Sequence, residues 1–166
     1  MPERLSTLLS QTASTGAAPA EWREVAVLLW HDAPETKPRE LVWSTVPHYK
    51  PEPAANDPLV FPITKQVVRP NAFALGVTLG RAQSHDIAVE MPSVSRFHCY
   101  FQRDEGSGVW FVVDAESFNG TFCEGVRLSP KRPAPLADRA KLRFGFVEMR
   151  FLSSQAFGVM LKQGRL

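Results

Sequence analysis

The chain has few cysteines, little imbalance of charge and no long apolar run. Only two of its 166 residues are cysteine, Cys99 and Cys123. They form no CxxC pair or regular series, which argues against a disulfide framework or a zinc site. The longest apolar candidate, residues 25–30, is far too short for a membrane span of roughly 20 residues. The 19 basic and 17 acidic side chains contain no basic run that could follow a nucleic-acid backbone. We therefore expect no metal, no membrane and no nucleic acid among the partners.

The scarcity of cysteine also suits a reducing compartment. The first nine residues, MPERLSTLL, lack the basic head and long apolar run of a secretory signal. With 44% apolar residues, the chain can bury one ordinary core with an appended segment. The composition therefore predicts one compact domain in the cytoplasm.

Catalysis is not expected. An enzyme would need a nucleophile beside a base, or a metal cluster. Neither emerges from the spacing of the histidines and cysteines, which are His31, His48, His85, His98, Cys99 and Cys123. The sequence predicts no catalytic residue and no cofactor.

Residues 1–58 are predicted to form a partly ordered N-terminal extension. Residues 3–12 can form a short helix with three leucines on one side. Residues 21–30 are apolar enough to be buried, but their pattern fits a helix and a strand equally well. From residue 34 the extension is rich in proline, which disfavours long helices and central strands.

From residue 59 the sequence changes to short β-rich runs separated by turn residues, a pattern typical of an antiparallel sandwich. A serine N-cap at Ser153 or Ser154 predicts a C-terminal helix over residues 155–162, in a segment 153–166 that packs on the sandwich. The expected strands are Val60–Thr64, Gly76–Gly80, Asp86–Val89, His98–Arg103, Val109–Asp114, Thr121–Cys123, Val126–Leu128, Lys141–Phe144 and Val147–Leu152.

Three short stretches lie at expected junctions between strands and loops. At such junctions a β-scaffold can hold an arginine, a hydroxyl and an asparagine against one exposed anionic group. Each stretch alone is a weak signal, but the ordered set is a strong one. The stretches are Gly80-Arg81, Ser95-Arg96-Phe97-His98 and Ser117-Phe118-Asn119-Gly120-Thr121.

Together with Asp86-Ile87 and Asp114, these stretches resemble the forkhead-associated (FHA) domain, a phosphothreonine-binding β-sandwich of intracellular signalling proteins. The resemblance covers residues 59–152 and implies an all-β fold, an antiparallel sandwich of about eleven strands. It also implies that loops at one end of the sheets hold the phosphopeptide. The chain would then be a signalling adaptor downstream of a Ser/Thr kinase, and its partner a phosphothreonine-containing protein, either such a kinase or its substrate.

The resemblance also assigns roles to residues. Arg81 would bind the phosphate, because a guanidinium group is always charged and presents paired donors. Ser95 would donate its hydroxyl to the same group, and Asn119 would bond to the peptide backbone. The implied phosphopeptide-binding residues are Arg81, Ser95, Arg96, Ser117, Phe118 and Asn119. The implied supporting residues are Gly80, His98 and Gly120.

Two positions depart from the family pattern. Phe118 stands where the family often has threonine or serine, and it could pack against an apolar peptide side chain or simply cap the loop. His85 stands where asparagine is frequent, which keeps a polar group but makes it titratable. The alternative to phosphopeptide binding is a scaffold that uses the sandwich and the N-terminal extension for phosphate-independent contacts. Binding that survives Arg81→Ala and phosphatase treatment would distinguish it.

Overall fold

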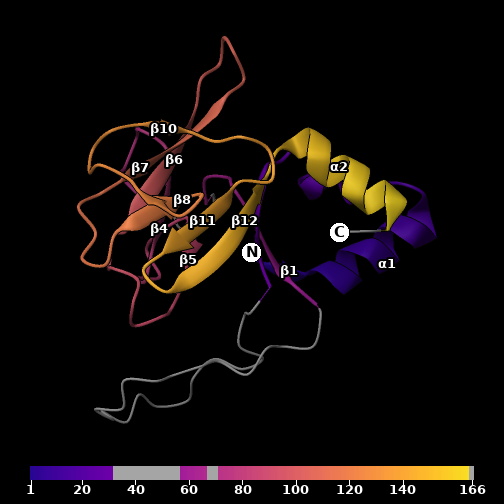
Figure 1. Cartoon of the computed structure of the whole chain (residues 1–166). Coiled ribbons are helices and arrows are strands. Elements are labelled where there is room, and N and C mark those ends of the chain that lie inside the picture. Colours follow the sequence, from indigo (N-terminus) through magenta and orange to yellow (C-terminus); the bar gives the residue numbers. More distant parts are fainter. Residues whose placement is uncertain (32–56, 67–70, 165–166) are drawn as a thin grey trace.

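The structure is a computed structural model that describes residues 1–31, 57–66 and 71–164. The proline-rich part of the expected extension, from residue 34 to 56, lies outside the described residues. The described chain forms two sheets packed face to face, with two helices beside one of them (Figure 1). The expected all-β sandwich is confirmed.

The seven-stranded sheet has the order β1-β3-β2-β12-β11-β8-β9, and the five-stranded sheet has the order β10-β7-β6-β4-β5. The strands are β1 (Glu3–Arg4), β2 (Val27–Trp30), β3 (Leu59–Pro62), β4 (Val77–Gly80), β5 (Ile87–Ala88), β6 (Cys99–Arg103), β7 (Trp110–Asp114), β8 (Thr121–Cys123), β9 (Val126–Arg127), β10 (Ala134–Pro135), β11 (Lys141–Phe144) and β12 (Val147–Leu152). The helices are α1 (Leu5–Thr15), the short 3-10 helix η1 (Ala20–Trp22) and α2 (Ser154–Gln163).

Each strand expected between residues 60 and 152 is present, some shortened by one or two residues. The sequence pattern missed β1 and β10, because a two-residue strand has no readable alternation. One pairing is not antiparallel, since β5 runs parallel to β4. After β4 the chain turns back toward the start of that strand before β5 begins. There the Asp86 side chain accepts a hydrogen bond from the Thr78 N–H.

β2 explains why the sequence pattern of residues 21–30 was ambiguous. It lies between β3 and β12 and is buried on both faces. Leu28 and Trp30 face the core between the sheets, while Val27 and Leu29 face the helices. A strand covered on both sides reads as a continuous apolar run, without the alternation of a half-exposed strand. Part of residues 1–58 is therefore a central strand of the sheet.

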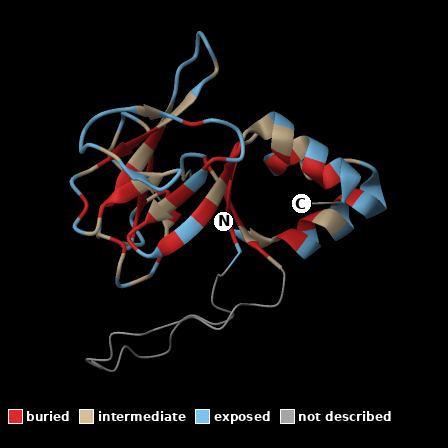
Figure 2. Cartoon of the chain, viewed as in Figure 1, coloured by how far each residue is buried: buried red, intermediate tan, exposed pale blue. Residues whose placement is uncertain are grey.

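The two helices cover one half of the outer face of the seven-stranded sheet. Buried residues of α1 and α2, red on the two helices in Figure 2, form one cluster with buried residues of β2, β3 and β12. Ser153 caps α2 by accepting a hydrogen bond from the Ala156 N–H, as expected. The second core consists of Leu5, Leu8, Trp22, Val27, Leu29, Val60, Leu152, Phe157, Met160 and Leu161.

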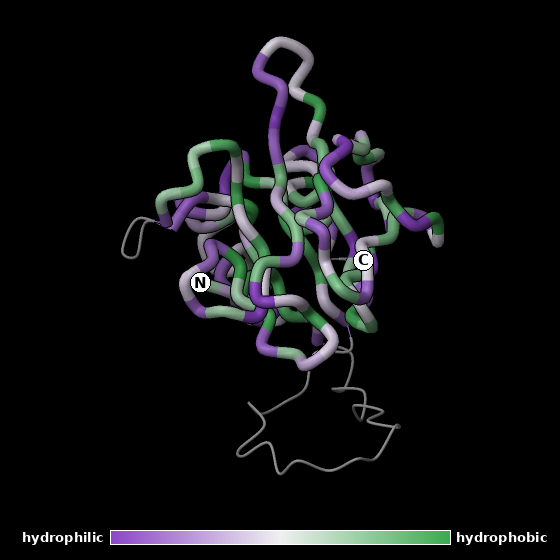
Figure 3. Tube along the Cα trace, turned by 90° about the vertical axis from the view of Figure 1, so that its left-hand side faces the viewer, coloured by the Kyte–Doolittle hydropathy of each residue, from purple (hydrophilic) through white to green (hydrophobic). Residues whose placement is uncertain are grey.

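The hairpin between β6 and β7 projects from the sandwich, and Figure 3 shows few hydrophobic residues at its tip. Arg103 lies at this end of β6, whereas Cys99 lies at the other. Among the helices of the described residues, none has the length and apolar character needed to cross a membrane.

Candidate functional site

The three predicted stretches meet at one end of the sandwich. In the five-stranded sheet, Leu79 pairs with Cys99 and Cys99 pairs with Asp114. The end of β4, the start of β6 and the end of β7 therefore lie side by side at the same end of the sheet. The loops after β4, before β6 and after β7 all start or finish at this end. Hydrogen bonds between these loops then fix their relative positions.

Arg81 and Arg96 lie on two loops that are bonded to each other. The Arg81 N–H donates to the Ser95 carbonyl at 2.9 Å, and the Ala82 N–H donates to the Arg96 carbonyl at 3.3 Å. Both arginine side chains are exposed. Within the part of the chain that the structure describes, neither guanidinium group makes a hydrogen bond or an ion pair. Both cations can therefore bind an external anion without breaking an internal contact.

Gly80 allows this close approach of the two loops. A Cβ atom at Gly80 would lie 2.1 Å from the Arg96 carbonyl oxygen and 2.6 Å from Cδ2 of His85. Real Cβ atoms do not come so close to a backbone oxygen. The supporting role expected of Gly80 is thus steric: any side chain here would push the loop that carries Ser95 and Arg96 away.

His85 fills the space beside Gly80. Its ring stacks on Phe97 with 5.0 Å between ring centroids. Its Nδ1 is buried and has no hydrogen-bond partner among the described residues. Burial lowers the pKa of His85, while a hydrogen bond with the Arg96 backbone and the nearby Asp86 carboxylate act in the opposite direction. At neutral pH the ring is therefore an uncharged packing element under the arginine loops.

His98 ties the loop before β6 to the loop after β7. Its Nδ1 accepts a hydrogen bond from the Ser95 N–H at 3.0 Å, so the ring proton must lie on Nε2, which is 3.2 Å from the Gly120 carbonyl. Burial lowers the pKa of His98, and the Gly120 hydrogen bond and the Asp114 charge only partly offset this effect. The neutral ring is the form that can make both bonds. The structural placement expected for His98 agrees with this geometry.

Ser117 lies in a supporting layer and not on the loop surface, which differs from the expected contact with peptide. It is 8% exposed, and its hydroxyl donates to Oδ1 of the buried Asp114 at 2.5 Å. The Thr121 hydroxyl donates to the same oxygen at 2.6 Å. The buried carboxylate attracts both hydroxyls because no water can satisfy it. Asp114 and Ser117 therefore shape the loop that presents Asn119.

Ser95, in contrast, keeps a hydroxyl proton for an external partner. Its Oγ accepts a hydrogen bond from the Phe118 N–H at 3.0 Å. The same hydroxyl donates to no acceptor within residues 1–31, 57–66 and 71–164. A hydroxyl that accepts one bond can still donate another. Ser95 thus joins the two loops and can also donate to a phosphate oxygen.

Asn119 and Phe146 both form hydrogen bonds with Ser93 at the same end of the sandwich. Asn119 Nδ2 donates to the Ser93 carbonyl at 2.8 Å, and the Phe146 N–H donates to the Ser93 hydroxyl at 3.2 Å. Phe118 is 90% exposed and Phe146 is 79% exposed. Phe118 therefore packs on little of the described chain, and its contact with a peptide stays a prediction. The sequence pattern had not pointed to Phe146.

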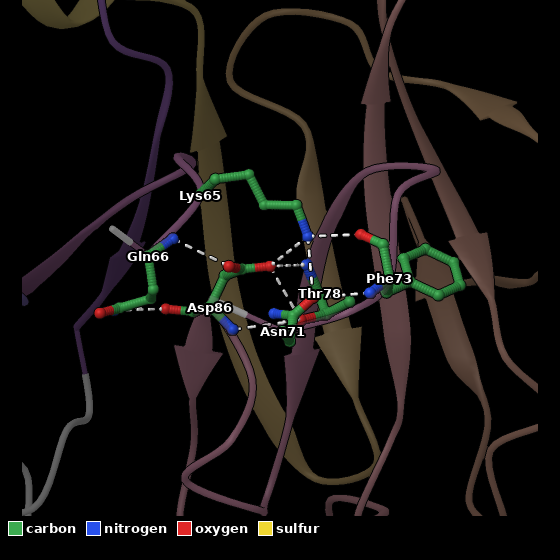
Figure 4. Close-up of polar contacts among 6 residues, drawn as sticks. All are labelled: Lys65, Gln66, Asn71, Phe73, Thr78 and Asp86. Carbon is green, nitrogen blue, oxygen red and sulfur yellow. Dashed lines mark hydrogen bonds and ion pairs between the residues drawn. The ribbon is translucent and has the colours of Figure 1, made fainter. Parts of the chain in front are cut away.

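Asp86 is a buried carboxylate that joins the segment of Lys65 and Gln66 to the start of β4 (Figure 4). One of its oxygens accepts bonds from the Thr78 N–H at 2.8 Å and the Thr78 hydroxyl at 2.9 Å, and it pairs with Lys65 at 3.1 Å. The other oxygen accepts the Gln66 N–H at 2.9 Å. Burial alone would raise the pKa of Asp86, but backbone bonds from Thr78 and Gln66 and contacts with Asn71 and Lys65 lower it to about 2.

Comparison with known proteins agrees with this geometry. Residues 77–145 match the FHA domain family. A stretch of 52 residues is 38% identical to an E3 ubiquitin-protein ligase rnf8 of Danio rerio, and it covers 31% of this chain and 10% of that protein. Residues 77–145 are therefore similar in sequence to FHA domains, and the chain spans about a tenth of the curated relative that it matches.

Solved structures agree with the fold. The FHA domain of the CT664 protein from Chlamydia trachomatis is similar with a TM-score of 0.53 and 15% identity, over 78% of this chain and 97% of that chain. An engineered FHA domain solved with a Myc-pTBD peptide is similar with a TM-score of 0.50 and 14% identity, over 86% and 98% of the two chains. At such identities the likeness concerns the fold alone.

Proposed function

We propose that this chain is a phosphothreonine-dependent protein-binding module and acts as a signalling adaptor downstream of a Ser/Thr kinase. The observation that carries the proposal is the pair of exposed, internally unpartnered guanidinium groups of Arg81 and Arg96 on adjoining loops. A phosphothreonine carries about −1.5 to −2 charges at neutral pH, so two arginines can neutralise most of it. The partner is then a phosphothreonine-containing protein, either such a kinase or its substrate.

In this proposal each loop has a separate task. Arg81 and Arg96 bind the phosphate, and the Ser95 hydroxyl donates to one of its oxygens. Asn119 contacts the main chain of the bound peptide, while its Nδ2 bond to Ser93 holds the side chain in place. Binding of this kind needs no nucleophile, proton transfer or cofactor. The protein would therefore act by recognition, without a catalytic step.

The direct test is titration of the purified protein with an oriented peptide library in three versions, carrying phosphothreonine, phosphoserine or unphosphorylated threonine. We expect binding to the phosphothreonine version, weaker binding to phosphoserine by roughly tenfold if the threonine methyl group fills an apolar niche, and none to threonine. Treatment of the first library with phosphatase should abolish its binding. Equal binding to all three versions would contradict the proposal and favour the phosphate-independent scaffold.

Phe118 is expected to add affinity through an apolar side chain of the peptide. It is 90% exposed, so its replacement removes no core contact. Phe118→Ala should weaken the best phosphothreonine peptide by about fivefold, in line with one aromatic contact, and leave the free energy of unfolding nearly unchanged. Isothermal titration measures the first quantity and urea denaturation the second.

Leu75→Ala is the matched control, because Leu75 is 63% exposed and its carbonyl binds Gln102, toward the opposite end of β6. An equal loss of affinity in both variants, or no loss in Phe118→Ala, would argue against a contact between Phe118 and the peptide.

A further inference from the structure

Among the described residues, the two helices cover only part of the outer face of the seven-stranded sheet. The second core covers β2 and β3 and the end of β12, where Val27, Val60 and Leu152 pack under the helices. On β8, β9 and β11, side chains of the same sheet form a row that neither helix covers. The row runs across the sheet because Phe122 pairs with Arg127 on one side and with Arg143 on the other.

Arg143 is fixed in this row before any ligand arrives. Its guanidinium carbon lies 3.5 Å from the centre of the Phe122 ring. Its Nη1 donates to the Gly145 carbonyl at 2.6 Å. These two contacts limit the rotation of a long side chain, so little conformational entropy remains to be lost when it binds an anion. They also cover the Phe122 ring, which disfavours an apolar occupant.

Arg127 connects the row to the candidate peptide site. A Cβ atom at Gly120 would lie 2.7 Å from Nε of Arg127, so the guanidinium group packs directly on Gly120. Asn119 precedes this glycine in the chain. The Gly145 N–H donates to the Gly120 carbonyl at 3.1 Å, which brings the turn beside Arg143 to the same place. Arg127 and the turn beside Arg143 therefore lie next to Asn119, the residue expected to contact the peptide.

The charges on this face favour an anion. Arg127 is exposed, and within the described residues its side chain makes no hydrogen bond or ion pair. A hollow on the Arg143 side of the row, which Arg127 does not line, has the basic side chains of Lys141, Arg143 and Arg150 and the acidic side chains of Glu124 and Glu148. Glu148 is the cross-strand neighbour of Arg143 on β12. Glu124 already accepts a hydrogen bond from the Lys141 N–H.

We propose that Arg127 and Arg143 bind an aspartate or glutamate side chain of the same phosphopeptide, at a position outside the phosphothreonine. The proposal rests on the proposed function, because it takes the phosphothreonine to lie at Arg81. A peptide that crosses Asn119 and Gly120 brings its next side chains over the arginine row. The acidic residue then selects among phosphothreonine partners, while the phosphate switches binding on and off.

The test uses the full chain and the best phosphothreonine peptide from the library. Each peptide position around the phosphothreonine carries glutamate, glutamine or lysine in turn. At one or two adjacent positions on one side, we expect glutamate to bind about fivefold more tightly than glutamine, a typical gain for a charge-assisted hydrogen bond, and lysine more weakly than both. The preference should shrink at high salt, because screening weakens exposed charge pairs.

Arg127→Gln is the decisive variant, since this exposed side chain carries little of the fold. It should reduce the ratio of glutamate to glutamine affinity to about one, while the dependence on phosphate stays intact. Arg143→Gln should lower the same ratio, and Arg103→Gln, at the far end of β6, should leave it unchanged. Phosphate-dependent binding without a glutamate preference, or a preference that survives Arg127→Gln, would overturn this inference alone. Loss of phosphate dependence in the unmodified protein would instead overturn the proposed function.

Discussion

The Arg81→Ala variant should bind the phosphopeptide at least about thirtyfold more weakly than the unmodified protein and keep its fold. Removing one partner of a close charge pair typically costs about 2–5 kcal/mol of binding free energy. The Arg81 side chain is exposed and makes no hydrogen bond or ion pair within the described residues, so the free energy of unfolding should change by less than about 0.5 kcal/mol. Isothermal titration with the phosphothreonine peptide and urea denaturation measure the two effects.

Arg103→Ala is the matched control, because it also removes an exposed arginine of the five-stranded sheet, at the end away from the loops. It should bind the peptide like the unmodified protein. Unfolding of Arg81→Ala would contradict the assignment of Arg81 as a ligand-binding residue, and so would peptide binding that Arg81→Ala leaves intact.

Asp86→Ala should destabilise the protein by about 3–5 kcal/mol, the range for breaking a buried ion pair. The Asp86 side chain is 0% exposed, and its loss would remove the carboxylate that accepts from the Thr78 N–H and the Gln66 N–H and that pairs with Lys65. Urea denaturation gives the change directly. Asp104→Ala is the control: Asp104 is an exposed aspartate in the projecting hairpin, so its loss should cost far less.

The same carboxylate should make the stability depend on pH in acid. The pKa of Asp86 is about 2 in the folded chain against an ordinary value of 3.8. A lowered folded pKa means that its contribution is fully present above pH 3.8 and is lost as the pH falls toward 2. The shift corresponds to about 2 kcal/mol. In Asp86→Asn this part of the acid dependence should disappear, and an unchanged slope between pH 4 and pH 2 would contradict the role of Asp86.

Motif order and turn chemistry made the strands of the sandwich and the loops of the site predictable. The glycines and short polar runs of the three stretches mark the strand ends, and short β-rich runs lie between them. Arg81, Ser95, Arg96 and Asn119 do lie on adjoining loops. Their contact with a phosphopeptide stays a prediction, which the titrations test.

Other features depended on partners far apart in the sequence. The Ser117 side chain points inward because its hydroxyl donates to the buried Asp114 carboxylate, as the Thr121 hydroxyl also does. The sequence of a loop does not reveal which of its side chains will form such a bond. Phe146 belongs to a turn between β11 and β12, which is held at the site by hydrogen bonds to the Ser93 hydroxyl and the Gly120 carbonyl. Arg127 meets Gly120 only because β9 folds back on β8.

By itself, the sequence determined the class of fold, the ends of most strands and the residues around which a phosphate site could form. These properties depend on local alternation, turn residues and motif order, which short windows of sequence contain. Tertiary structure decided that β2 is a central strand, that Asp86 and Asp114 are buried, and that Arg127 lies against Gly120. Burial and the hydrogen bonds that satisfy it arise from contacts between distant segments, so no local window could have revealed them.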